Sequence, residues 1–183
     1  IHWGPKGDNM PRLKRFISDV KDGVTPQTLW LHNEVGHTQE AKQELLSVVD
    51  FGNSAEVFIT PKPTRLIERV LQIATNPGDL ILDSFAGSGT TGHAVLKLNR
   101  NASAQSSRRF IMVEMEAKIA REVTAERVRR VADGYTNAKG EKVEGLGGSF
   151  RFCELGEPLF DEGGKIRESV RFGELARHVY FTE

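Results

Sequence analysis

The stretch ILDSFAGSGTTG, residues 81–92, constrains the fold of this chain more than any other part of its sequence. An apolar run leads into a glycine-rich turn, and the residues from Thr90 onward have the pattern of a helix. A strand that passes through such a turn into a helix brings backbone N–H groups towards a ligand. Gly87, Gly89 and Gly92 also form a literal G-x-G-x-x-G, a pattern typical of dinucleotide-binding folds. The stretch therefore predicts an α/β fold with a ligand at this turn.

The flanking segments continue the alternation of strands and helices. Apolar runs predict strands at 80–85, 109–114 and 149–155, and helical periodicity predicts helices at 90–98 and at about 117–132. Three further helices are expected upstream, over 11–23, from the N-cap Thr38 to 49, and after the TPKP segment at 60–63. The β-α-β-α-β order of the middle of the chain is typical of a parallel sheet with flanking helices.

The residues around the glycine turn restrict the ligand. Thr90 and Thr91 stand where a phosphate-binding loop has its lysine, which argues against a nucleoside triphosphatase function. Asp83, at the strand end, would repel a pyrophosphate but suits a cationic group. S-adenosylmethionine carries an ammonium and a sulfonium for Asp83, and a ribose diol for a second acid. Glu114 ends the next strand and is a candidate for that acid, although its position fits NAD equally well.

Two motifs carry a resemblance to a known family. DSFAGSGTT, residues 83–91, resembles motif I of the β-class amino DNA methyltransferases, and TPKPTRLIERVLQIAT, residues 60–75, resembles their motif X. The resemblance implies a partial Rossmann-like, S-adenosylmethionine-dependent methyltransferase fold. It also implies that the cofactor is lined by the matching residues, which are Thr60, Lys62, Pro63, Asp83, Phe85, Ala86, Gly87, Gly89, Thr90 and Glu114.

The ends of the chain narrow the resemblance. Residues 26–45 and 147–181 are similar to segments of the methylation (Mod) subunits of type III restriction-modification systems. This implies transfer of a methyl group to adenine N6 in DNA, with a restriction subunit as a further partner. It also implies that residues 1–59 follow a target-recognition region, that 60–155 are the cofactor-binding core, and that 156–183 are a C-terminal extension.

The catalytic loop of such enzymes is not found in this sequence. It contains two adjacent prolines that precede an aromatic residue, and its polar groups bind the amino group of a flipped base. The prolines of this chain are at 5, 11, 26, 61, 63, 77 and 158, so no two are adjacent. We therefore assign no catalytic residue and expect a truncated part of a longer protein, inactive by itself.

Truncation has a consequence for the sheet. In methyltransferases that resemble this chain, the strand matching 80–85 also pairs with the strand that carries the catalytic loop. Without that neighbour the strand has a row of unpaired N–H and C=O groups, which favours pairing with another chain. We expect the chain either to form a homodimer or to cover this edge with its own segment 25–35.

Other charged residues are assigned no site. The 25 basic and 25 acidic residues give no overall positive field, so contact with DNA phosphates would depend on local clusters. The candidate clusters, which are better interpreted as solvated helix faces, are Arg12, Lys14 and Arg15, and Arg127, Arg129 and Arg130. No metal is assigned to His32, Glu34 and His37, and His93 is a surface or packing residue. The single cysteine and the absence of long apolar runs predict a cytoplasmic protein that does not span a membrane.

Two alternatives remain open. The literal glycine pattern and Glu114 also fit an NAD-binding oxidoreductase domain, against which stand Asp83 and the TPKP segment. The second alternative is a non-catalytic interaction module, which keeps the fold of the pocket only for assembly with other proteins.

Overall fold

The computed structural model describes residues 6, 25–52, 60–100, 102–137 and 139–182. The chain divides into two compact units, Ile1–Gly148 and Ser149–Glu183. The helix expected over 11–23, with Arg12, Lys14 and Arg15, lies outside the described residues.

The first unit is a mixed α/β structure built on a small parallel sheet. Strand β1 (Leu80–Asp83) pairs in parallel with β2 (Arg109–Met112), and Asp83 stands opposite Met112. Parallel strands require a crossover connection, and here it passes through helix α4 (Thr90–Asn99). Both strands lie within the ranges that the apolar runs predicted, and α4 confirms the predicted helix.

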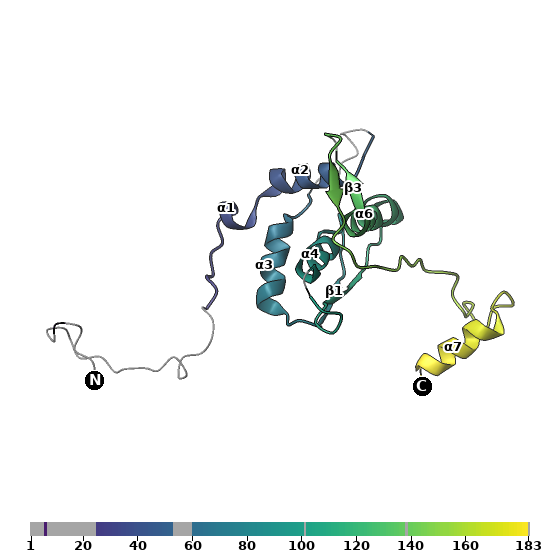
Figure 1. The fold of residues 1–183 in the computed structure, drawn as a ribbon. Coiled ribbons are helices and arrows are strands. Elements are labelled where there is room, and N and C mark those ends of the chain that lie inside the picture. The colour runs from purple at the N-terminus through teal and green to yellow at the C-terminus, as the bar shows by residue number, and fades with distance from the viewer. Residues whose placement is uncertain (1–5, 7–24, 53–59, 101, 138, 183) are drawn as a thin grey trace. The chain divides into compact units, whose positions relative to one another are not determined.

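Helices cover one face of this sheet. Helix α3 (Thr64–Ala74) lies beside α4 (Figure 1), and their apolar side chains form a core with alternate residues of the strands. That core consists of Leu71, Ile81, Ala94 and Val95, with Ile67, Leu98 and Phe110 packed against it. Successive side chains of a strand point to opposite faces. The other face accordingly presents exposed apolar side chains, those of Leu80, Leu82, Ile111 and Val113.

The N-terminal segment of the described chain packs against α3. After the short helix α1 (His32–Val35) comes α2 (Thr38–Val48), whose N-cap is His37, because the Glu40 N–H donates to His37 Nδ1 at 3.3 Å. The expected cap at Thr38 was wrong by one residue. Arg65 of α3 donates to the carbonyl oxygens of Asn33 and Glu34, at 3.1 and 2.9 Å.

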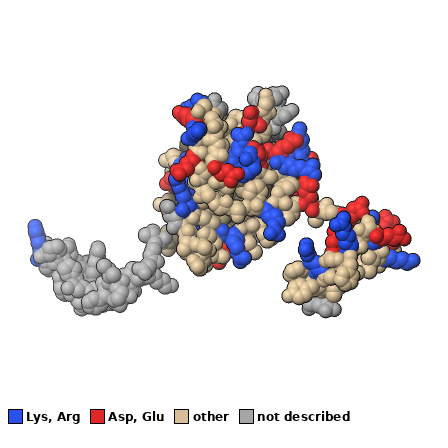
Figure 2. Space-filling model, turned by 45° about the vertical axis from the view of Figure 1, so that its right-hand side comes forward, with Lys and Arg blue, Asp and Glu red and all other residues tan. Residues whose placement is uncertain are grey.

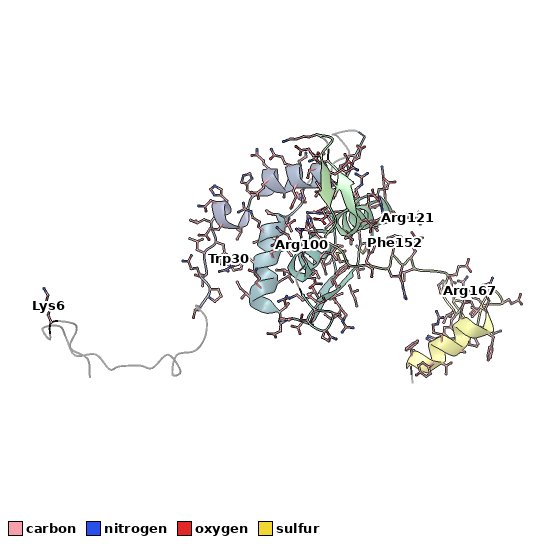
Figure 3. The ribbon with its side chains drawn as sticks, in the orientation of Figure 1. Lys6, Trp30, Arg100, Arg121, Phe152 and Arg167 are labelled. Atoms are coloured by element: carbon pink, nitrogen blue, oxygen red, sulfur yellow. The ribbon has the colours of Figure 1, made fainter. Side chains whose placement is uncertain are left out.

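Segment 25–35 therefore does not cover the free edge of β1. Its tryptophan, Trp30 (Figure 3), donates its indole N–H to the Gln27 carbonyl within the same segment. Among the described residues β1 pairs only with β2, so the covering of the edge by this segment is not found. Self-association of the chain stays a prediction.

The long helix expected after β2 is present but irregular. It consists of α5 (Ala117–Ile119), the π-helical turn η3 (Ala120–Ala125) and α6 (Glu126–Asp133), which follow one another without a break. Single π-helical turns inside α-helices often occur at functional sites. The apolar periodicity indicated the helix but not this turn.

The predicted third parallel strand was wrong. Residues 149–155 form neither helix nor strand, and the preceding glycine-rich segment instead forms an antiparallel pair, β3 (Gly134–Thr136) with β4 (Lys142–Glu144). Asn137 supports this pair, because its Oδ1 accepts the N–H groups of Lys139 and Glu141, both at 3.0 Å. An alternating apolar segment becomes a strand only where a neighbouring strand pairs with it. β3 and β4 are close in sequence and pair with each other, whereas 149–155 pair with no strand among the described residues.

Among its described residues the second unit contains one helix, α7 (Phe172–Thr182). A single antiparallel bridge joins Phe160 to Ile166. Asp161 closes the intervening turn by accepting the N–H groups of Gly163 and Lys165. Across the described residues of both units, none of the helices has the length and apolar character that a bilayer crossing requires.

Candidate functional site

The three glycines of the G-x-G-x-x-G pattern have different surroundings. Gly87 and Gly89 have φ angles of 51° and 72°, a left-handed conformation that favours glycine. A Cβ at Gly89 would lie 3.0 Å from the Thr124 carbonyl oxygen, and one at Gly92 would lie 2.8 Å from Val128 Cγ2. Gly89 and Gly92 therefore allow close packing against the helix that follows β2. Gly87 is the half-buried member of the three.

Two carboxylates brace this turn from the ends of the two parallel strands. Glu114 follows β2, and its Oε2 accepts the Gly87 N–H at 2.9 Å while its Oε1 accepts the Glu116 N–H at 3.0 Å. Asp83 ends β1, and its two oxygens accept the Phe85 N–H at 3.1 Å and the Thr91 hydroxyl at 2.5 Å. Both acids are half-buried, so each keeps part of its surface open to solvent.

The segment 60–63 lies against the same turn. Pro61 and Pro63 are buried, whereas Thr60 and Lys62 are exposed. The Thr90 hydroxyl donates to the Lys62 carbonyl oxygen at 3.3 Å, and the Lys62 ammonium donates to the Thr60 carbonyl at 3.3 Å. The segment 60–63 and the glycine turn, which are separated in sequence by helix α3 and strand β1, therefore meet at one place.

The sequence-predicted site residues differ in how open they are. Phe85 is 81% exposed, whereas Ala86 is buried and donates its N–H to the Val113 carbonyl. The Thr90 side chain is only 4% exposed and its hydroxyl contacts other protein groups. A ligand at the turn would therefore not reach the Thr90 hydroxyl. The residues with side chains open to solvent are Thr60, Lys62, Asp83, Phe85 and Glu114.

Arg127 corrects one expectation. It was assigned to a solvated helix face with Arg129 and Arg130, but its side chain is fully buried. Arg129 and Arg130 do lie at the surface, where they form ion pairs with Glu126 at 2.7 and 2.6 Å. The Arg127 guanidinium donates to acceptors from four parts of the fold. We call this group the Arg127 cluster; it consists of Glu44, Thr64, Ser88, Thr90, His93 and Arg127.

His93 contributes a neutral imidazole to the cluster. It is buried, as the packing interpretation expected, and its Nδ1 accepts from Arg127 Nε at 3.3 Å. Burial, together with the positive charges of Arg127 and Lys97, lowers the pKa of His93 from 6.5 to about 3. The imidazole is therefore neutral near pH 7, and its proton is on Nε2 because Nδ1 acts as the acceptor.

Thr124 is a site residue that the sequence reasoning missed. It lies in the π-helical turn, and its hydroxyl donates to the Gly87 carbonyl at 2.6 Å. No sequence pattern indicated this contact. For Arg127 a signal did exist, because its spacing from Val123 and Val131 puts it on the apolar stripe of the helix.

The remaining candidates do not form a site. His37 serves as a helix cap, and its ring centre is 6.1 Å from that of His32. Within the described part of the chain, no three His, Cys, Asp or Glu side chains are grouped in a way that would hold a metal ion. On the face shown in Figure 2, basic and acidic side chains are intermixed.

Comparison with known proteins identifies the family. Residues 5–126 match the model of the N6/N4-type DNA methylases. The chain therefore belongs to the N6/N4 DNA methylase family, which confirms the resemblance inferred from residues 60–75 and 83–91 and does not favour the NAD-binding alternative.

Curated relatives agree with this assignment. The chain is 31% identical over 145 residues to the StyLTI Mod subunit of a type III restriction-modification enzyme from Salmonella typhimurium, covering 72% of this chain and 21% of that protein. It is 32% identical over 133 residues to the EcoPI Mod subunit of Escherichia phage P1, covering 64% and 20%. It is also 32% identical over 145 residues to the type II methyltransferase M.KpnI of Klebsiella pneumoniae, covering 72% and 33%. The chain thus spans between a fifth and a third of the length of these relatives.

Proposed function

We propose that this chain is the S-adenosylmethionine-binding part of a site-specific DNA methyltransferase that modifies adenine at N6, within a restriction-modification system. The observation that carries the proposal is the meeting of the segment 60–63 with a glycine turn that is flanked by Asp83 and Glu114. The small parallel sheet is compatible with a Rossmann-like methyltransferase core. The choice of adenine, and a restriction subunit as partner, rest on the resemblance to Mod subunits.

The donor set fits the charges of this cofactor. Asp83 is half-open at the end of β1 and offers a carboxylate to the ammonium and sulfonium end. Each oxygen of Glu114 already accepts one N–H, but a carboxylate has about four acceptor sites, so it can also accept from ribose hydroxyls. When bound, the cofactor supplies an activated methyl group. The residues of this chain bind and orient it.

We predict that the purified 183-residue chain does not methylate DNA. The family's catalytic loop needs adjacent prolines, and the sequence has none. Transfer of labelled methyl groups from S-adenosylmethionine to adenine-containing DNA should therefore stay at background. Labelled N6-methyladenine in the product would contradict the prediction.

Replacing Asp83 should weaken cofactor binding more than replacing Lys62. Asp83→Ala removes a negative charge beside the cationic end of the cofactor and an acceptor for the Thr91 hydroxyl. Lys62 is exposed, and backbone N–H groups remain for the cofactor carboxylate after Lys62→Ala. We expect a loss of about tenfold in affinity for Asp83→Ala and about threefold for Lys62→Ala, measured by calorimetry.

Asp83→Asn is the matched control. It retains an acceptor for the Phe85 N–H but not the charge, so it separates bracing of the turn from attraction of a cation. Affinity in Asp83→Asn that equals the wild-type value would contradict the electrostatic role of Asp83.

Titration with S-adenosylmethionine and with NAD tests the proposed function directly. Binding of S-adenosylmethionine but not NAD is the expected result. Preference for NAD would favour the oxidoreductase alternative. Failure of both to bind, even when the missing part of the protein is supplied, would favour a non-catalytic interaction module.

A further inference from the structure

The buried guanidinium of Arg127 contacts both halves of the candidate site. Its Nη2 is 3.0 Å from the hydroxyl oxygen of Thr64, the first residue of α3, which follows the segment 60–63 directly. Its Nη1 is 3.3 Å from the carbonyl oxygen of Ser88 in the glycine turn, and 2.9 Å from the hydroxyl of Thr90, which begins α4 directly after that turn. One side chain of α6 therefore bridges the two stretches.

The apolar core alone does not fix this spacing. On α3 the core contacts are made by Ile67 and Leu71, whereas the end of the helix beside the site is held by the polar contact of Thr64 and by the buried Pro61 and Pro63 before it. Apolar packing is non-directional. A guanidinium, by contrast, presents five N–H donors in a rigid plane and so fixes the positions of the groups that accept from it.

The charge of Arg127 is balanced and its donors are used. Glu44 Oε2 lies 3.1 Å from Arg127 Nη2 and also accepts the Thr64 hydroxyl at 2.6 Å. Among the described residues, no buried side-chain nitrogen or oxygen lacks a hydrogen-bond partner. Apolar residues of similar volume often stabilise a fold as much as a buried ion pair does. Stability alone therefore does not explain an arginine at this position, whereas geometry does.

We propose that Arg127 is a positioning residue that sets the distance between the segment 60–63 and the glycine turn, and thereby the affinity for the cofactor. It acts through Thr64, Ser88 and Thr90, because its own side chain is fully buried and does not reach a ligand. The link to cofactor affinity rests on the proposed function.

Arg127→Lys tests the proposal. A lysine keeps the charge, but its single ammonium has only three donors and cannot reach the acceptors of both stretches together. We expect the affinity for S-adenosylmethionine to fall by about tenfold. Hydrogen exchange should become faster for the Gly89 amide, which donates to Ala86, and for the Leu66 amide, which donates to Pro63. The amides of β1 and of the middle of α4 should keep their wild-type exchange rates.

Arg130→Lys is the matched control. Arg130 lies on the same helix and also ties it to α2, through the Val48 carbonyl at 3.1 Å, but it contacts neither stretch of the site. We expect its cofactor affinity to stay within about twofold of wild type. An equal loss in both variants, unchanged affinity in Arg127→Lys, or exchange that accelerates uniformly along the chain would overturn the proposal.

Two further variants serve if Arg127→Lys does not fold. Thr64→Val removes the contact to α3, and Ser88→Ala removes the side-chain contact to the turn at 3.3 Å. Each should accelerate exchange in its own stretch and weaken cofactor binding, and unchanged affinity in both would contradict the proposal. If the wild-type chain does not bind S-adenosylmethionine even when the missing part of the protein is supplied, the proposed function fails. The exchange pattern, which needs no cofactor, still decides the role of Arg127.

Discussion

Lowering the pH from 6.5 to 4.5 should destabilise this chain by about 2–3 kcal/mol through His93 alone. Burial and the positive charges of Arg127 and Lys97 lower the pKa of His93 from 6.5 to about 3, so His93 stays neutral in the folded state but takes up a proton in the unfolded state. The stability is fully present above pH 6.5 and is lost as the pH falls towards 3, at about 1.4 kcal/mol per pH unit. Protonation would also turn Nδ1 from an acceptor into a donor that faces the Arg127 guanidinium.

Urea unfolding across this pH range, in wild type and in His93→Gln, measures the effect. A glutamine offers an amide oxygen to Arg127 but does not titrate, so the variant should lose most of the slope. The range ends at 4.5 because the pKa values of Glu40 and Glu126 are lowered by hydrogen bonds from arginines, and these carboxylates add their own dependence below it. His32→Gln, at an exposed position, should keep the wild-type slope. A slope that persists in His93→Gln would contradict the prediction.

Gly89→Ala should cost about 2 kcal/mol of folding free energy. Gly89 has a φ angle of 72°, which L-residues rarely adopt, and a Cβ there would lie 3.0 Å from the Thr124 carbonyl oxygen. That oxygen belongs to the backbone and cannot rotate away. The glycine turn and the π-helical turn must therefore separate, which we expect to weaken S-adenosylmethionine binding as well.

Gly156→Ala is the control for Gly89→Ala. A Cβ at Gly156 would meet no atom within 4 Å, so its folding free energy should change by less than about 0.5 kcal/mol. Urea unfolding curves of the two variants make the comparison. A change for Gly89→Ala as small as that for Gly156→Ala would show that the turn adapts without strain.

The elements that could be predicted from the sequence are those with local causes. The apolar stripe of α3 and the apolar run of β1 are visible as periodicities, and they place the segment 60–63 and Asp83 at the ends of these elements. Residues 149–155 have the same kind of local pattern and yet form no strand, because a strand depends on a partner that the local sequence does not specify.

The sequence predicted which segments form the site, but not the buried contacts that hold those segments together. A glycine pattern indicates a tight turn but does not tell which glycine faces a ligand and which one faces a helix. Arg127 was misassigned because arginines on a helix are usually solvated, although its place on the apolar stripe was readable. Thr124 could not be foreseen, because its contact with Gly87 depends on a π-helical turn that no periodicity indicates.

The π-helical turn also limits how the length of this region can change. A π-helical turn holds one residue more than an α-helical one, so deleting a single residue from Ala120–Ala125 would let the helix become regular. Regularisation would rotate the preceding residues by about 100° relative to Arg127. Glu114, which accepts the Gly87 N–H, and Arg127, which donates to Ser88 and Thr90, would then no longer contact this region together. The shortened helix would be more regular but less able to support this site. Insertions and deletions here should therefore be tolerated far less than in the loop 102–107, whose residues 103–105 are exposed.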